Sequence, residues 1–127
     1  MPAPVVKICR EYDFDAAHQL EWHPGACRRL HGHTYTLELS VAGRLDERGV
    51  VMDFAELDQV VRSQVLDKVD HHYLNDLIEN PTAERIAQWM WDRIAEAGIA
   101  PAELRLWETR RSSVHLLDPG RASGVDG

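Results

Sequence analysis

Hydrophobic and polar residues alternate in two stretches near the start of the chain, and this pattern predicts two β-strands. The alternation is imperfect over residues 5–14 and regular over residues 34–43. In the second stretch every other residue is apolar, namely Tyr35, Leu37, Leu39 and Val41. A period of two residues is typical of a strand with one buried face. The segment between the strands, residues 21–29, contains Pro24 and Gly25 and predicts a loop.

After residue 52 the hydrophobic period lengthens to about 3.6 residues, which indicates helices. Asp53 is the predicted N-cap of a first helix that runs to about Val69. A second helix is predicted to begin around Asn80-Pro81-Thr82, which offers a capping residue and a proline suited to the first helical position. Gly98 fits the end of this helix.

Two further strands are predicted, over residues 104–109 and 113–117. The order strand, strand, helix, helix, strand, strand favours an α+β fold, with a four-stranded antiparallel sheet and two helices on one face. We expect a single domain over residues 1–118 and a flexible C-terminal tail over 119–127. Such a sheet has two free edges and one bare face, so we also expect the chain to self-associate.

Composition limits the classes of function. The chain has 127 residues, a net charge of −7 and 44% hydrophobic residues, which fits one globular domain. The acidic balance argues against a nucleic-acid binder, and no apolar run reaches the roughly 20 residues of a membrane span. The first residues lack the features of a signal peptide, and Cys9 and Cys27 make a poor disulfide framework. We therefore expect a cytoplasmic protein.

Histidine is the unusual residue, with seven copies. His31 and His33 flank Gly32, and in an extended strand residues two apart point to the same side. Both imidazoles can then reach one ion, and Gly32 removes a side chain that could crowd a close approach of the backbone. A catalytic zinc site needs a third ligand, for which His18, at the end of the first strand, is the best candidate. The alternative is a pair of surface or packed histidines.

Cys27 precedes His31 by four residues and is followed by Arg28 and Arg29. Nearby guanidinium groups and a nearby metal favour the thiolate, which can act as a base. Alternatively, Cys27 is a fourth ligand that closes a structural zinc site without catalysis, or an inert small residue.

Two acidic features complete the candidate chemistry. Asp70 adjoins His71 after the first predicted helix, as in a general acid/base pair, although such a pair at a helix end can also be a cap or a surface pair. Glu108 lies in an apolar strand, where a carboxylate is costly to bury without partners. Its alternative interpretation is an outward-facing strand position.

Together these features match one family. The sequence resembles the 6-pyruvoyl-tetrahydropterin synthase family, most closely its bacterial 6-carboxy-tetrahydropterin synthase branch of the queuosine pathway, over residues 5–117. The blocks that carry the resemblance are Phe14-Asp15-Ala16-Ala17-His18, Cys27-Arg28-Arg29-Leu30-His31-Gly32-His33, Met52-Asp53-Phe54, Asp70-His71-His72-Tyr73-Leu74-Asn75, Pro81-Thr82-Ala83-Glu84 and Trp107-Glu108-Thr109.

The resemblance implies a tunnelling fold, in which subunits close into an oligomeric barrel, expected here to be a hexamer, with active sites at subunit interfaces. Residue by residue it implies these roles: zinc ligands at His18, His31 and His33; a general base at Cys27; a second acid/base in the pair Asp70 and His71; a pterin anchor at Glu108; and a pocket lined by Thr82 and Glu84.

The implied activity is that of a lyase. It converts 7,8-dihydroneopterin triphosphate to 6-carboxy-5,6,7,8-tetrahydropterin, acetaldehyde and triphosphate, with zinc as Lewis acid and template. Candidate triphosphate contacts, on charge alone, are Arg28, Arg29, Arg110 and Arg111. One alternative is the pyruvoyl-forming reaction, in which the side chain is retained. An alternative of another class is a non-catalytic zinc- or pterin-binding module with Cys27 as the fourth ligand.

Overall fold

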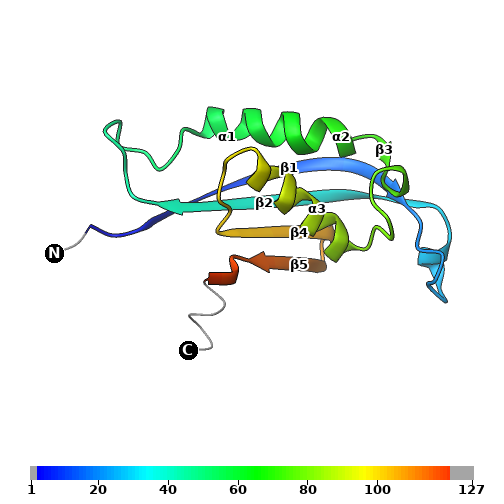
Figure 1. Cartoon of the computed structure of the whole chain (residues 1–127). Coiled ribbons are helices and arrows are strands. Elements are labelled where there is room, and N and C mark those ends of the chain that lie inside the picture. Colours follow the sequence, from blue (N-terminus) through cyan, green and yellow to red (C-terminus); the bar gives the residue numbers. More distant parts are fainter. Residues whose placement is uncertain (1–2, 121–127) are drawn as a thin grey trace.

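A long antiparallel hairpin forms the centre of the molecule. The structure, a computed structural model, describes residues 3–120. Strands β1 (Val6–His18) and β2 (His31–Gly43) lie side by side along their whole length (Figure 1). In their register, His18 is the partner of His31. Both strands extend further toward their connecting loop than the sequence pattern predicts. The extension places His18, His31 and His33 on paired strands, as their predicted role as ligands requires.

The sheet has five strands, so the predicted four-stranded, wholly antiparallel sheet is wrong. β4 (Glu103–Thr109) pairs antiparallel with β2, and β5 (Ser112–Leu117) pairs antiparallel with β4. The fifth strand, β3 (His72–Tyr73), runs parallel to the end of β1, and the strand order is β3-β1-β2-β4-β5. β3 has two residues, which is too short for a pattern of alternation to reveal it in the sequence.

The first predicted helix is present over residues 54–69, in three consecutive segments. These are α1 (Phe54–Val61), a π-helical segment η2 (Arg62–Leu66) and α2 (Asp67–Val69). Asp53 is its N-cap, as predicted, because its carboxylate accepts a hydrogen bond from the Ala55 N–H. Residues 51 and 52, just before this cap, form a bend.

The second helix is α3 (Ala83–Glu96). Thr82 caps it, and the Thr82 hydroxyl accepts a hydrogen bond from the Arg85 N–H at 3.1 Å. Pro81 therefore precedes the cap, and its predicted place in the first helical position is wrong. Gly98 has φ of 96°, a left-handed conformation that suits glycine, so the predicted stop signal is confirmed.

The helices pack on one face of the sheet and form a single core with it (Figure 1). Its members are apolar and almost fully buried, and they include Tyr35, Leu37, Leu39, Leu57, Val61, Ile86, Met90, Ile94, Leu104 and Leu106. The α+β class and the layer arrangement are thus as predicted. Alternate residues of the long hairpin, such as Asp15 and Thr34, are exposed on the opposite face, which no element of the described chain covers.

Two short 3₁₀ segments lie near the strand ends, η1 (Ala26–Arg28) and η3 (Leu74–Asp76). None of the helices in residues 3–120 has the length and apolar character that crossing a bilayer requires. Of the tail predicted to be flexible, residues 121–127 lie outside the described residues.

Candidate metal centre and active site

Three histidines and one glutamate converge at the end of the β1–β2 hairpin. The ligand atoms of His18, His31, His33 and Glu108 all lie within 4.8 Å of one another. The antiparallel register explains this, because His18 is the partner of His31, and His33 follows on the same face. His18 is completely buried. The structure therefore brings together the three residues that the sequence predicts as metal ligands.

Backbone carbonyl groups fix the orientation of two imidazole rings. His18 Nδ1 lies 2.8 Å from the carbonyl oxygen of Pro81, and His31 Nδ1 lies 2.7 Å from that of Arg29. A carbonyl oxygen only accepts hydrogen bonds, so each Nδ1 donates and each Nε2 presents a lone pair.

The Nε2 atoms of all three histidines are buried and have no hydrogen-bond partner among the described residues. Leaving a buried polar atom unpaired is costly, so this arrangement needs a further occupant. Three imidazole ligands with room for a further ligand are the donor set of a catalytic zinc site. The residues present thus fit such a metal.

Glu108 faces the histidines, so its interpretation as an outward strand position is wrong. Its Oε1 atom lies 3.1 Å from His33 Nε2 and 3.7 Å from His18 Nε2. Its direction follows from β4, where it continues the inward series of Leu104 and Leu106. A shift in the β4–β5 register between Trp107 and Thr109 leaves Glu108 without a partner on β5. The carboxylate can therefore accept a ligand's N–H groups or contact an ion.

Burial lowers the pKa of His33 below its ordinary value. The Glu108 carboxylate opposes this effect, whereas the neighbouring His18 and His31 rings add to it. The lowered pKa keeps the His33 ring uncharged at neutral pH, which is the form that can bind a metal.

Cys27 lies in η1, within the loop between β1 and β2. The loop is closed by a hydrogen bond from the Leu20 N–H to the Cys27 carbonyl oxygen at 2.8 Å. The Cys27 side chain is half-buried and its thiol is free. Within residues 3–120, the group of converging ligand atoms contains the three histidines and Glu108 but not the Cys27 sulfur.

The candidate arginines lie in separate places. Arg28 and Arg29 are exposed beside a hollow of about 710 Å³ that Gln19 and Glu21 also line. Arg110 lines a different hollow of about 320 Å³ together with Trp107, Thr34 and other residues of the open sheet face. The structure therefore does not gather these four arginines into one cationic cluster.

Asp70 and His71 form a close pair attached to the edge of β1. The distance from His71 Nδ1 to Asp70 Oδ1 is 3.0 Å. The Asp15 N–H donates to Asp70 Oδ1 at 3.0 Å, and the Asp15 carbonyl accepts from the His71 N–H at 2.6 Å. The bond from the Asp15 N–H and the contact with His71 lower the pKa of Asp70. His71 has φ of 59°, a left-handed conformation that is uncommon outside glycine and often marks functional sites.

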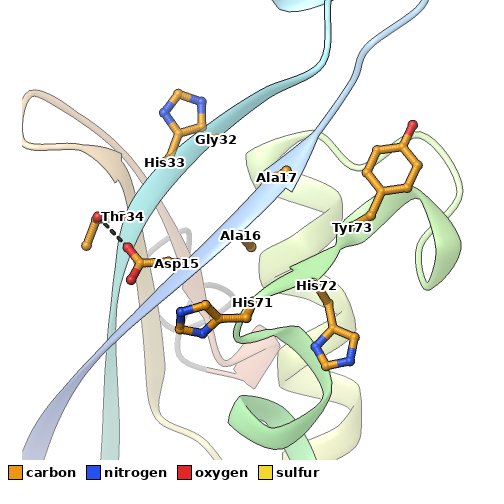
Figure 2. Close-up of a pocket in the computed structure, with 9 residues that line it drawn as sticks. All are labelled: Asp15, Ala16, Ala17, Gly32, His33, Thr34, His71, His72 and Tyr73. Atoms are coloured by element: carbon orange, nitrogen blue, oxygen red, sulfur yellow. Dashed lines mark hydrogen bonds between the residues drawn. The ribbon is translucent and has the colours of Figure 1, made fainter.

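Within one chain, this pair is separate from the three histidines. The Asp70 and His71 atoms group with the Asp15 carboxylate, which points to the open face of the sheet, opposite to His33. Figure 2 shows the His33 ring pointing away from Asp15 and His71. A hollow of about 570 Å³ runs along this part of the sheet, and His33 and His71 both line it. His71 is exposed there, with 76% of its side chain accessible.

Gly32 also lines this hollow (Figure 2). A Cβ atom at this position would lie 3.4 Å from the Ala16 carbonyl oxygen, which is an ordinary contact. Within the isolated chain, the backbone of β1 therefore does not approach Gly32 closely enough to require a glycine, contrary to the expectation. A side chain at Gly32 would instead project into the hollow.

Thr82 and Glu84 lie at the start of α3, and neither belongs to the group of converging ligand atoms in the described chain. The Thr82 hydroxyl caps the helix, and Glu84 is exposed in its first turn. Pro81, which precedes them, contacts the histidine site directly, because its carbonyl orients His18.

Several groups at the site were not predicted from the sequence. The carbonyls of Arg29 and Pro81 belong to the backbone, which every residue has, so the sequence does not predict their contacts with the histidines. Asp15 belongs to a block that carries the family resemblance, but the resemblance assigns it no role. Tyr35 is predicted as a core residue, but its hydroxyl is buried without a partner beside the histidines. Its position on the same strand face as His31 and His33 is a signal that sequence analysis can use.

Comparison with known proteins identifies the family of the chain. The family model described as 6-pyruvoyl tetrahydropterin synthase matches residues 7–118. A 6-carboxy-5,6,7,8-tetrahydropterin synthase from Synechocystis is 41% identical over 120 residues, covering 88% of this chain and 93% of that protein. A dihydroneopterin monophosphate aldolase from Pyrococcus furiosus is 39% identical over 116 residues, covering 87% and 96%.

The solved structure of the Caenorhabditis elegans 6-pyruvoyl tetrahydropterin synthase has the same fold. It aligns with a TM-score of 0.79 and 26% identity, over 91% of this chain and 96% of that one. The family model and the Synechocystis relative both span most of the chain. On this evidence, the chain belongs to the 6-pyruvoyl tetrahydropterin synthase family.

Proposed function

We propose that this protein is a zinc-dependent lyase that converts 7,8-dihydroneopterin triphosphate to 6-carboxy-5,6,7,8-tetrahydropterin, acetaldehyde and triphosphate, a step of queuosine biosynthesis. The observation that carries the proposal is the convergence of three buried, unpartnered Nε2 atoms with the Cys27 thiol outside the ligand group. The 41% identity to a relative named 6-carboxy-5,6,7,8-tetrahydropterin synthase supports this choice of reaction.

In this proposal His18, His31 and His33 hold the zinc ion. When bound, zinc supplies a Lewis acid and a template for the hydroxyl groups of the substrate side chain. The Pro81 and Arg29 carbonyls keep the Nε2 atoms of His18 and His31 directed at the metal position. Burial of His18 limits the access of water to the ligand set.

The remaining residues bind the pterin and move protons. The Cys27 thiolate accepts a proton from the substrate side chain. Asp70 accepts the His71 Nδ1–H, which leaves His71 Nε2 to take up or release a second proton. Glu108 accepts hydrogen bonds from the N–H groups of the pterin ring, a charge-assisted pattern that discriminates well when it is partly buried. Thr82 and Glu84 line the pterin pocket.

A second copy of the chain completes the site. The histidine group lies on the helix-covered face of the sheet, whereas Asp70 and His71 lie with Asp15 toward the open face. We infer that the Asp70–His71 pair of one subunit serves the zinc site of another, in a homo-oligomer of which a hexamer is the expected form. We place this assembly in the cytoplasm, consistent with its two free cysteines.

A second candidate activity is aldol-type cleavage of dihydroneopterin monophosphate. It is favoured by the 39% identity to a relative named dihydroneopterin monophosphate aldolase. The family name also keeps the pyruvoyl-forming reaction as an alternative. The three reactions differ in the phosphate on the substrate and in the fate of the side chain, so products distinguish them.

The decisive experiment is incubation of the zinc-loaded protein with dihydroneopterin triphosphate and, separately, with the monophosphate, followed by mass analysis. We expect 6-carboxy-tetrahydropterin and acetaldehyde from the triphosphate. A product that retains the three-carbon side chain assigns the pyruvoyl reaction. Turnover of the monophosphate alone assigns the aldolase. Either of these outcomes contradicts the proposal.

A further inference from the structure

Residues 3–120 contain four buried side-chain nitrogen or oxygen atoms without a hydrogen-bond partner, and all four lie in one place. Three are the Nε2 atoms of His18, His31 and His33, and the fourth is the hydroxyl oxygen of Tyr35. A bound metal ion would be the missing partner of the three histidine nitrogens. It would not provide a partner for the tyrosine hydroxyl.

Tyr35 is held firmly beside the histidines. It follows His33 by two residues on the same face of β2 and is completely buried. Its ring centroid lies 5.5 Å from that of His33 and 6.1 Å from that of His18. On the other side, its ring stacks on Phe14, with centroids 4.9 Å apart and planes inclined by 6°. This packing fixes the orientation of the Tyr35 ring and therefore the direction of its hydroxyl group.

A phenylalanine would provide the same packing without an unpaired hydroxyl. A buried hydroxyl without a partner is destabilising, so its presence indicates that a partner arrives from outside the chain. As a phenolic O–H, the hydroxyl of Tyr35 can donate a hydrogen bond to that partner.

We propose that Tyr35 donates a hydrogen bond to a side-chain oxygen of the pterin that binds at the three-histidine site, and so selects pterins with a hydroxylated side chain. This inference rests on the proposed function, because it takes a pterin as the ligand. It adds a specificity-determining residue to the ligands and proton-transfer groups.

The test compares two ligands on two proteins. Neopterin carries a hydroxylated side chain, and 6-methylpterin has the same ring without side-chain hydroxyl groups. Each is titrated into zinc-loaded wild type and zinc-loaded Tyr35→Phe, with pterin fluorescence as the readout. We expect Tyr35→Phe to weaken neopterin binding about tenfold, the loss of one hydrogen bond, and to leave 6-methylpterin binding unchanged. Zinc content should be the same in both proteins.

Thermal unfolding of the metal-free proteins separates this role from a structural one. Tyr35→Phe should melt at the same temperature as wild type or higher, because it removes an unpaired buried hydroxyl. The matched control is Tyr12→Phe. The Tyr12 hydroxyl donates to Asp58 at 2.6 Å, away from the histidines, so this variant should melt lower and bind both pterins normally.

Two outcomes overturn the inference: unchanged neopterin affinity in Tyr35→Phe, or an equal loss for both ligands. The second outcome would mean that the hydroxyl acts on the ring or through Glu108. If wild type binds neither pterin, the proposed function and this inference fail together. If it binds both but forms no product, the proposed reaction fails, and the binding comparison still decides the role of Tyr35.

Discussion

At the scale of single residues, the chemistry depends on which side-chain atoms already have a hydrogen-bond partner and which remain available to a ligand. The Nδ1 atoms of His18 and His31 are engaged by backbone carbonyls, so their Nε2 atoms remain for a metal. Cys27 is half-buried and lies outside the group of converging ligand atoms. These assignments separate an enzyme from a zinc-binding module, because the module requires Cys27 as a fourth ligand.

Cys27→Ala should retain zinc and lose at least about a hundredfold in turnover, because a general base contributes that much or more. His31→Ala, the matched comparison, should lose both zinc and turnover. The measurements are zinc per subunit by elemental analysis and product formation from dihydroneopterin triphosphate. Loss of zinc from Cys27→Ala would show that the sulfur is a ligand and would support the module.

At the scale of elements, one polar cluster ties α1 to the central hairpin. Arg10 on β1 donates two hydrogen bonds to the Asp58 carboxylate, at 3.1 and 3.0 Å, and Tyr12 donates a third at 2.6 Å. The bonds from Tyr12 and Arg10 lower the pKa of Asp58. A carboxyl group whose pKa is lower in the folded state stabilises the protein above its unfolded pKa, and this contribution disappears as the pH falls through the folded value.

Asp58→Asn should therefore destabilise the protein by about 1 kcal/mol at neutral pH, a figure reduced for solvent screening. The difference from wild type should shrink as the pH falls below about 4, where the wild-type carboxylate also becomes protonated. Urea unfolding at neutral and acid pH measures both values. Asp67→Asn, at an exposed carboxylate of the same helix, is the control and should change little. An equal loss at all pH values would contradict the electrostatic explanation.

At the scale of the whole molecule, the two halves of the proposed site lie toward opposite faces of one sheet. His18, His31 and His33 belong to the helix-covered face, and Asp70 and His71 are attached to Asp15 near the open face. The open face and the sheet edges are available for a second copy. The proposed function therefore predicts that two copies of the chain are needed to complete one site.

Co-expression of His31→Ala with His71→Ala should restore activity that neither variant has alone. Random mixing places an intact zinc site beside an intact Asp70–His71 pair in about a quarter of the sites, so we expect about a quarter of wild-type turnover. Sedimentation of the purified mixture establishes that the variants share oligomers. Mixed oligomers without recovered activity would show that each chain builds its site alone.

Removal of the metal should lower the melting temperature, because a ligand that binds only the folded state stabilises it by mass action. Zinc at a hundredfold excess over its dissociation constant contributes about 2.7 kcal/mol. Melting curves with and without a chelator measure the effect. The curve of His31→Ala should not respond to the chelator, and an unresponsive wild type would argue against a metal at the three histidines.

The sequence by itself determined the α+β class, the two long helices with the cap of the first at Asp53, and the convergence of His18, His31 and His33. These features depend on local period, capping chemistry and antiparallel register, all of which act over short stretches of chain. Tertiary structure alone decided the parallel strand β3, the inward direction of Glu108 and the separation of Asp70–His71 from the histidines. It also left Tyr35 with a buried, unpartnered hydroxyl. Each of these depends on contacts between residues distant in sequence, which no local pattern of residue types records.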